Sequence, residues 1–67
     1  MSLHDYHVSA FLASQDIAFY ALIMAAMRKA DTRNLQLLRT AWPEVWAELQ
    51  ARYNAPGGTL DTDEKEQ

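Results

Sequence analysis

The stretch that most constrains this chain is residues 17–27, which read IAFYALIMAAM. It contains no charged residue, no Gly and no Pro, and Tyr20 is its only side chain with a hydrogen-bonding group. A helix on the surface of a globular protein keeps one polar face toward water, and this stretch has no such face. We therefore expect it to be covered by the rest of the chain or by a second chain.

The composition of this stretch favours a helix over a strand. Ala, Leu and Met dominate it, and β-branched residues occur only at Ile17 and Ile23. Its apolar residues occupy both odd and even positions, whereas a half-buried strand alternates apolar with polar residues. Asp16 is predicted to cap the start of the helix, with Ser14 as the alternative cap. Basic residues follow it, which suits the negative end of a helix dipole, so we expect a helix over about residues 17–29.

The length of the apolar run argues against a membrane span. Eleven helical residues rise about 16 Å, and the hydrocarbon core of a bilayer is about 30 Å thick. The start MSLHDYH lacks the basic segment of a signal peptide, so a cytoplasmic protein is expected. The sequence contains no Cys, which excludes disulfides and zinc sites built from thiolates.

The size of the chain allows one domain with a small core. A chain of 67 residues buries only about 60% of its unfolded surface, so its stability is marginal without further support. Hydrophobic residues nevertheless make up 49% of it. Such a composition in so small a domain predicts self-association.

The charge is concentrated at the end of the sequence. The net charge is −3, and residues 61–67, DTDEKEQ, carry four acidic residues and one Lys, which accounts for all of it. Short acidic ends are usually solvated and disordered. We therefore predict a single helical domain over residues 1–58 and a disordered acidic tail over residues 59–67.

The first fifteen residues contain a weaker helical pattern. Val8, Phe11 and Leu12 have the i, i+3, i+4 spacing of an amphipathic helix. The pattern suggests a short helix over roughly residues 5–13, whose apolar stripe Leu3 and Tyr6 could extend.

Two more helices are expected after the central one. Asp31 is well placed to cap a helix over about residues 32–41. Pro43 suits the first position of another helix over residues 43–54, with a tight turn at Trp42. A single helix kinked at Pro43 is the alternative. The sequence thus predicts an all-α fold, a small bundle of three to four short helices around the central apolar helix.

An apolar seam continues through this proline. Its spacing of three and four is kept at Leu35, Leu38, Trp42, Val45 and Leu49. In the last helix, the predicted buried stripe consists of Trp42, Val45, Trp46, Leu49 and Tyr53. Glu44, Glu48 and Arg52 are expected on the opposite, solvated face, where Glu48 and Arg52 can form an i,i+4 pair. Asn54 is expected to end the helix in a left-handed conformation, before Pro-Gly-Gly.

The residue types that catalysis requires are missing or badly placed. The chain has no cysteine nucleophile and no Gly-rich phosphate-binding loop, and both histidines lie near the start. His4 and His7 could share a helix face, but a metal site needs three or four ligands. We therefore predict no enzyme activity, no cofactor and no metal site.

Two stretches together resemble a known group of proteins. At IAFYALIMAAMRKADT and AWPEVWAELQARYNAPGG the chain resembles short uncharacterised proteins encoded by actinobacteria and their phages. These share a FYALIMAAMR core and a FPEVW-type helix start, and the resemblance covers roughly residues 4–58. It implies no activity or site residues. It implies the context of a small phage-borne accessory protein that acts on another macromolecule.

The main functional expectation is protein–protein interaction, by homodimer formation, by binding a host or phage protein, or by both. The two short helices and the weak N-terminal one cannot surround a helix that is apolar on all sides, and aromatic residues are enriched at interfaces. Each aromatic residue is about as good a candidate for the core as for an interface. The predicted partner-binding residues are Phe19, Tyr20, Ile23, Met27, Trp42, Trp46 and Tyr53.

The alternative is a small helix-turn-helix-like nucleic-acid-binding regulator. Its possible contacts are Arg28, Lys29, Arg33 and Arg39. These residues lie on either side of a helix junction and have only Asp31 as an acidic neighbour. Residues 1–60 carry no net charge and residues 61–67 are acidic, whereas nucleic-acid-binding proteins usually have a basic surface. Nucleic-acid binding is therefore the weaker expectation.

Overall fold

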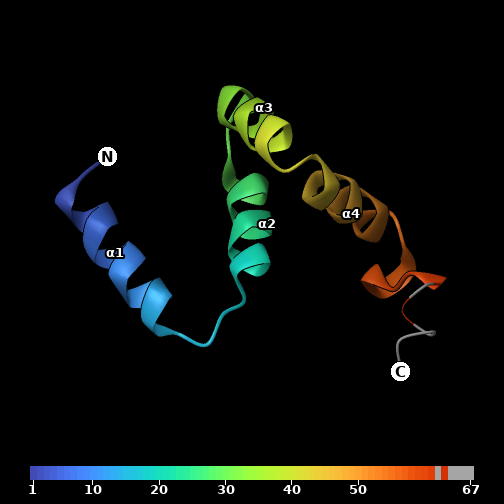
Figure 1. Cartoon of the computed structure of the whole chain (residues 1–67), viewed down its shortest axis with the longest axis horizontal. Helices are drawn as coiled ribbons and strands as arrows, with labels where there is room; N and C mark the ends of the chain where they lie inside the picture. The colour runs from blue at the N-terminus through green and yellow to red at the C-terminus, as the bar shows by residue number, and fades with distance from the viewer. Residues whose placement is uncertain (62, 64–67) are drawn as a thin grey trace.

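The described part of the chain, residues 1–61 and 63 of the computed structural model, is all-α (Figure 1). It contains no strand, and its helices are α1 (Leu3–Ser14), α2 (Phe19–Lys29), α3 (Thr32–Ala41) and α4 (Pro43–Tyr53), followed by the short 3-10 helix η1 (Pro56–Gly58). The predicted all-α fold is confirmed. None of the helices in this part is long and apolar enough to cross a membrane.

The first helix is longer than the sequence pattern indicated. It begins after Ser2, whose hydroxyl accepts a hydrogen bond from the backbone N–H of Asp5 at 3.1 Å. It ends where the N–H of Gln15 donates to the carbonyl of Leu12. Side-chain capping at residue 2 therefore adds the first half turn to α1.

The start of α2 differs from the prediction. Its N-cap is Ala18, which has no side-chain capping bond, so neither Asp16 nor Ser14 caps this helix. Ser14 belongs to α1, where its hydroxyl donates to the carbonyl of Phe11. Asp16 lies two residues before the cap position, in a connection whose ends at Gln15 and Ala18 are extended. The helix nevertheless ends at Lys29, as predicted.

The two helices on either side of Pro43 are separate. Asp31 caps α3 by accepting a 2.8 Å hydrogen bond from the N–H of Asn34, as predicted. Trp42 ends α3 and precedes α4, with φ −130° and ψ 67°, outside the helical region. Pro43 is the first residue of α4, so the single kinked helix is excluded. In the view of Figure 1 the two helices continue in a similar direction.

The end of α4 uses glycine rather than asparagine for the left-handed conformation. Asn54 has φ −89° and ψ −3°, so its prediction as a left-handed terminus is wrong. Its side chain donates to the carbonyl of Gln50, which keeps it on the helical path. The positive φ values occur at Gly57 and Gly58, where no Cβ makes them costly.

The core is small and lies among α2, α3 and α4. Within residues 1–61 and 63, the buried hydrophobic residues are Met27 of α2 and Leu49 of α4. The rest of the predicted seam is half-buried: Leu35, Leu38, Trp42 and Val45. Of the aromatic candidates for the core, Phe11, Phe19 and Tyr53 remain outside it, with exposed fractions of 63%, 57% and 74%. Phe11 is exposed because, in the described part, α1 packs against no other element.

The chain is more open than a compact protein of its size. Its radius of gyration is 14.1 Å, whereas about 11 Å is typical of 67 residues. It exposes 5859 Å² of surface, whereas a compact protein of 7.6 kDa exposes about 4,300 Å². The excess is about 1,600 Å² by that scaling, which indicates surface that this chain alone leaves uncovered.

A polar contact holds the segment after η1 against α4. The guanidinium of Arg52 donates to both carboxylate oxygens of Asp63, at 2.7 and 2.9 Å, and to the carbonyl of Gly58 at 2.8 Å. Arg52 also lies 3.5 Å from Glu48, which confirms the predicted pair. Of the predicted disordered tail, residues 62 and 64–67 lie outside the described residues, and Asp63 is bound to Arg52.

Candidate interaction surface

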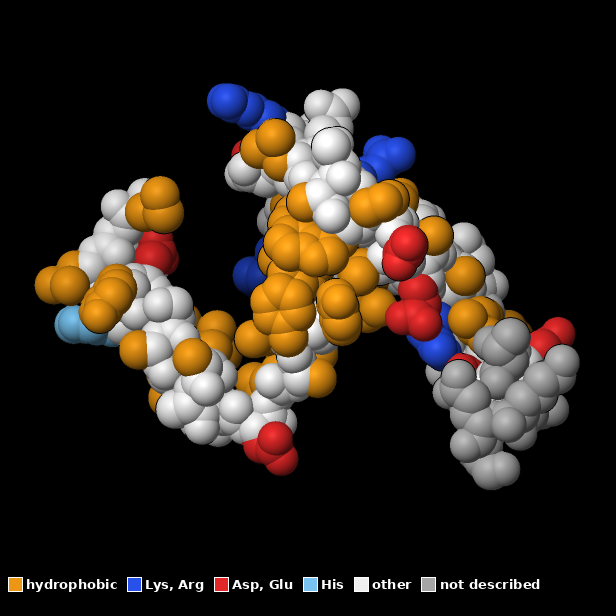
Figure 2. Space-filling model, viewed as in Figure 1, with side chains coloured by type: hydrophobic (Ala, Val, Ile, Leu, Met, Phe, Trp, Pro, Cys, Tyr) orange, Lys and Arg blue, Asp and Glu red, His pale blue; other side chains and the backbone are white. Residues whose placement is uncertain are grey.

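Aromatic rings from α2 and from the α3–α4 junction meet on one side of the molecule. The ring centroids of Phe19 and Trp42 are 6.2 Å apart, and those of Phe19 and Tyr20 are 5.3 Å apart, both in edge-to-face arrangement. Phe19 and Tyr20 are 57% and 56% exposed, and Trp42 is half-buried. Figure 2 shows hydrophobic side chains gathered over the centre of the molecule. We call Phe19, Tyr20, Trp42 and Val45 the aromatic face.

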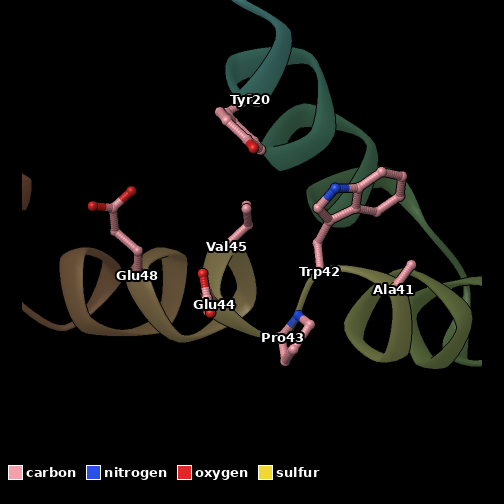
Figure 3. Close-up of a pocket in the computed structure, with 7 residues that line it drawn as sticks. All are labelled: Tyr20, Ala41, Trp42, Pro43, Glu44, Val45 and Glu48. Atoms are coloured by element: carbon pink, nitrogen blue, oxygen red, sulfur yellow. The ribbon is translucent and has the colours of Figure 1, made fainter.

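A hollow of about 490 Å³ opens in this face (Figure 3). Its lining residues are Tyr20, Ala41, Trp42, Pro43, Glu44, Val45 and Glu48. In Figure 3 the side chain of Val45 points from α4 toward Tyr20 of α2. Glu44 and Glu48 are both exposed, so the hollow combines apolar walls with an acidic edge.

The position of these two acids corrects a prediction. Sequence periodicity placed Glu44 and Glu48 opposite Trp42, yet all three line the same hollow. The reason is the backbone of Trp42, whose φ and ψ are not helical, so its side chain does not follow the helical wheel of α4. Pro43 is the signal that could have revealed this, since a proline at the first helical position puts the preceding residue outside the helix.

The seven predicted partner-binding residues do not form one strip. Tyr20 and Trp42 line the first hollow, and Phe19 packs beside them. A second hollow, of about 340 Å³, is lined by Met27, Arg28, Leu35, Trp46, Leu49, Gln50 and Tyr53. Ile23 is half-buried on α2. Met27 is buried, so it contributes to the core and leaves little side chain for a partner.

The four basic residues of the nucleic-acid alternative are all exposed: Arg28, Lys29, Arg33 and Arg39. The guanidinium of Arg39 lies over the ring of Trp46, 5.0 Å from its centroid, a cation–π contact. Arg28 lines the second hollow, which also contains Trp46. On the face shown in Figure 2, the Lys and Arg side chains are separated from one another by apolar and uncharged groups.

Helix α1 contains none of the site residues predicted from the sequence. Every residue of α1 is exposed, including Tyr6 and Phe11, and the helix stands apart from α2–α4 in Figure 1. The periodicity of Val8, Phe11 and Leu12 predicts an amphipathic helix, but it does not tell which surface covers that face. One further feature of its sequence is the absence of Lys and Arg from α1.

The perturbed titratable pair lies outside the hollows. The Arg52 guanidinium donates hydrogen bonds to Asp63, and the N–H of Leu60 adds another, which together hold the pKa of this carboxyl well below its usual range. The same contact raises the pKa of Arg52. This pair fastens the chain after η1 to α4.

Metal ligands are sparse in the described residues. No group of three or more His, Cys, Asp or Glu side chains there could hold a metal ion. His4 and His7 both lie on α1, where the ring of His7 is 5.9 Å from that of Tyr6.

A comparison with family models, with curated proteins and with solved structures finds no match to this chain. The geometry of the surface comprises an aromatic face, a hollow within it, and a helix that no other described element covers.

Proposed function

We propose that this chain is a small, non-catalytic interaction module that forms a homodimer through its aromatic face. The observation that carries the proposal is the excess of exposed surface, about 1,600 Å² beyond that of a compact protein of this mass. A standard protein interface buries about 800 Å² on each partner. The excess is therefore large enough for one such interface.

The residue types of the aromatic face support the same proposal. Trp and Tyr carry a large share of the binding energy at interfaces, most effectively in well-packed hollows. Tyr20 and Trp42 supply these residues here, and both line the first hollow. A two-fold pairing covers one such face on each copy with a single self-complementary contact.

The context of this function follows from the resemblance to short proteins of actinobacteria and their phages. We propose an accessory protein of the cytoplasm whose dimer acts on a host or phage protein. Nucleic-acid binding through residues 28–39 has no comparable support, because Arg39 already lies over the ring of Trp46.

Light scattering coupled to size exclusion tests the dimer. At about 100 µM we expect a particle of twice 7.6 kDa, and dilution should release the 7.6 kDa chain. A single 7.6 kDa species at every concentration would contradict the proposal.

A matched pair of variants locates the contact. Phe19→Ser should weaken the dimer by about tenfold or more, because burying a Phe side chain contributes about 1.5–3 kcal/mol. Leu37→Ser is the control, since Leu37 is 60% exposed on α3, outside the aromatic face. Equal effects of the two substitutions would place the interface elsewhere.

A further inference from the structure

We infer that α1 is an exchanged arm, which docks into the aromatic hollow of a second copy while the second copy's α1 docks into the hollow of the first. This inference rests on the proposed homodimer and names the segment that makes its contact. It commits to a second copy as the occupant of the hollow, with Phe11 as the anchoring side chain.

The first support is that α1 is a formed helix that no other described element covers. It is twelve residues long, with a side-chain cap at Ser2, and packs against no other described element. An isolated helix this short is marginal in water, because most helical stability comes from packing of an apolar face. Cover from another molecule would supply that packing.

The second support is the area that the two surfaces offer. Every residue of α1 is exposed, and so are Phe19 and Tyr20 of the aromatic face, so both surfaces contribute to the excess of about 1,600 Å². In a reciprocal exchange each chain buries its own α1 and its own hollow, so two contacts of this kind form for each dimer. The total reaches the size of a standard interface without any further surface.

The third support is the lack of basic residues in α1, which argues against a membrane or a nucleic acid as its partner. Asp5 is the only Asp or Glu in α1, which has no Lys or Arg, and residues 17–27 have no charged side chain at all. An anionic membrane surface or a nucleic acid attracts basic residues, which α1 lacks. Asp5 leaves α1 with a charge of −1, so its apolar side chains Val8, Phe11 and Leu12 are the ones assigned to the apolar walls of the hollow, and a copy of the same chain supplies them at equal concentration.

The connection between α1 and α2 fits an arm that leaves its own body. Gln15 and Ala18 have ψ values of 158° and 143°, so this part of the chain is extended where it leaves α1 and where it enters α2. Between these ends the chain bends at Gln15 and Asp16, where the N–H of Ile17 donates to the carbonyl of Gln15 at 2.9 Å, and this bend directs α1 away from its own α2. Exchange of an identical element across a short connection is a known route to dimers.

The anchor is assigned to Phe11 by its exposure and by the size of the hollow. Phe11 is 63% exposed and shares an i, i+3, i+4 face with Val8 and Leu12. The hollow of about 490 Å³ falls within the range of binding pockets, about 300–1,000 Å³. An apolar helix lying in an apolar groove is a recurrent recognition mode.

The first test uses two variants of the full chain that add the same charge to α1. Phe11→Glu should weaken the dimer by about 100-fold or more, because the anchor is lost and a carboxylate enters the hollow. Ser9→Glu is the control: two residues away on a helix is a rotation of about 200°, so its side chain lies on the opposite face. At a dilution where both variants are monomeric, near-ultraviolet circular dichroism of the tryptophans should be the same in both, since α1 does not contact α2–α4 of its own chain.

The second test identifies the contact directly. Copies labelled with ¹³C are mixed with unlabelled copies, and isotope-filtered nuclear Overhauser spectra should connect Phe11 of one copy to Trp42 or Val45 of the other. Contacts of Phe11 with its own chain only would overturn the exchange, and so would a dimer whose cross-peaks join α2 to α2 without α1.

The two proposals fail in different ways. A dimer of unchanged affinity in Phe11→Glu would refute the exchanged arm and leave the homodimer standing. A wild-type chain that stays at 7.6 kDa at every concentration would refute the homodimer, and the exchange with it.

Discussion

The rings of Phe19 and Trp42 meet edge to face, with centroids 6.2 Å apart, and join the first turn of α2 to the junction between α3 and α4. Such a pair contributes about 0.5–1.5 kcal/mol beyond the area that it buries. Both residues belong to the aromatic face, so one contact shapes the fold and the proposed interface together. Variants of this face therefore need a measurement of folding beside the measurement of association.

Association should appear in the thermal stability of the wild-type chain. Because dimer formation stabilises only the folded state, Tm should rise with protein concentration. We expect a rise of several degrees between about 5 and 500 µM, measured by circular dichroism at 222 nm. In Phe11→Glu the dependence should be much weaker. A wild-type Tm that is independent of concentration over this range would contradict the dimer.

The small core should be sensitive at Met27. Replacing a buried Met by Ala typically costs about 2–5 kcal/mol, a large share of the stability of a domain this size. Met27→Ala should therefore be largely unfolded at 37 °C by circular dichroism. Leu37→Ala, at an exposed position, should change the free energy of unfolding by no more than about 0.5 kcal/mol. A native-like Met27→Ala melt would mean that the core lies elsewhere.

Two aspartates before helices should differ in their contribution. Asp31 accepts a hydrogen bond from the N–H of Asn34, so Asp31→Ala should lower the free energy of unfolding by about 1 kcal/mol. Asp16 forms no such cap, so Asp16→Ala should have little effect. Urea denaturation of the two variants at the same protein concentration measures both values. A larger loss in Asp16→Ala would show that α2 begins earlier than residue 19.

The contact between Arg52 and Asp63 predicts a pH dependence. The pKa of Asp63 is lower in the folded chain than its ordinary value of 3.8, so the unfolded chain takes up this proton first as the pH falls. The stabilising contribution is complete above about pH 5 and is lost as the pH falls through the range below 4.

A variant isolates this contribution. The difference in free energy of unfolding between the wild type and Asp63→Asn should be constant between about pH 5 and 8 and should shrink from pH 5 toward pH 2. The contact is partly exposed, so the difference should be small and should decrease further at high salt. A difference that is the same at pH 2 and pH 7 would show that Asp63 is not held by an ionic contact.

The sequence determined the helices because their signals act over a few residues. Asp31 reaches the third backbone N–H after it, and Pro43 can only begin a helix or break one, so α3 and the start of α4 were predictable to the residue. The N-cap of α2 was predicted wrongly because the prediction used only such a short-range signal, the capping propensity of Asp16. Asp16 is a good capping residue, but the connection bends at Gln15 and Asp16 and becomes extended at Ala18, so α2 begins only at Phe19.

Tertiary structure decided which apolar surface is covered. The all-apolar composition of residues 17–27 requires cover, but only packing showed that Met27 receives it and that Phe19 and Tyr20 do not. Tertiary structure also decided the position of Trp42. Its side chain lines the same hollow as Glu44 and Glu48, because its backbone φ and ψ are not helical. Helical periodicity gives the face on which a residue lies. Which faces meet depends on contacts between residues far apart in the chain, and among the described elements α1 makes none.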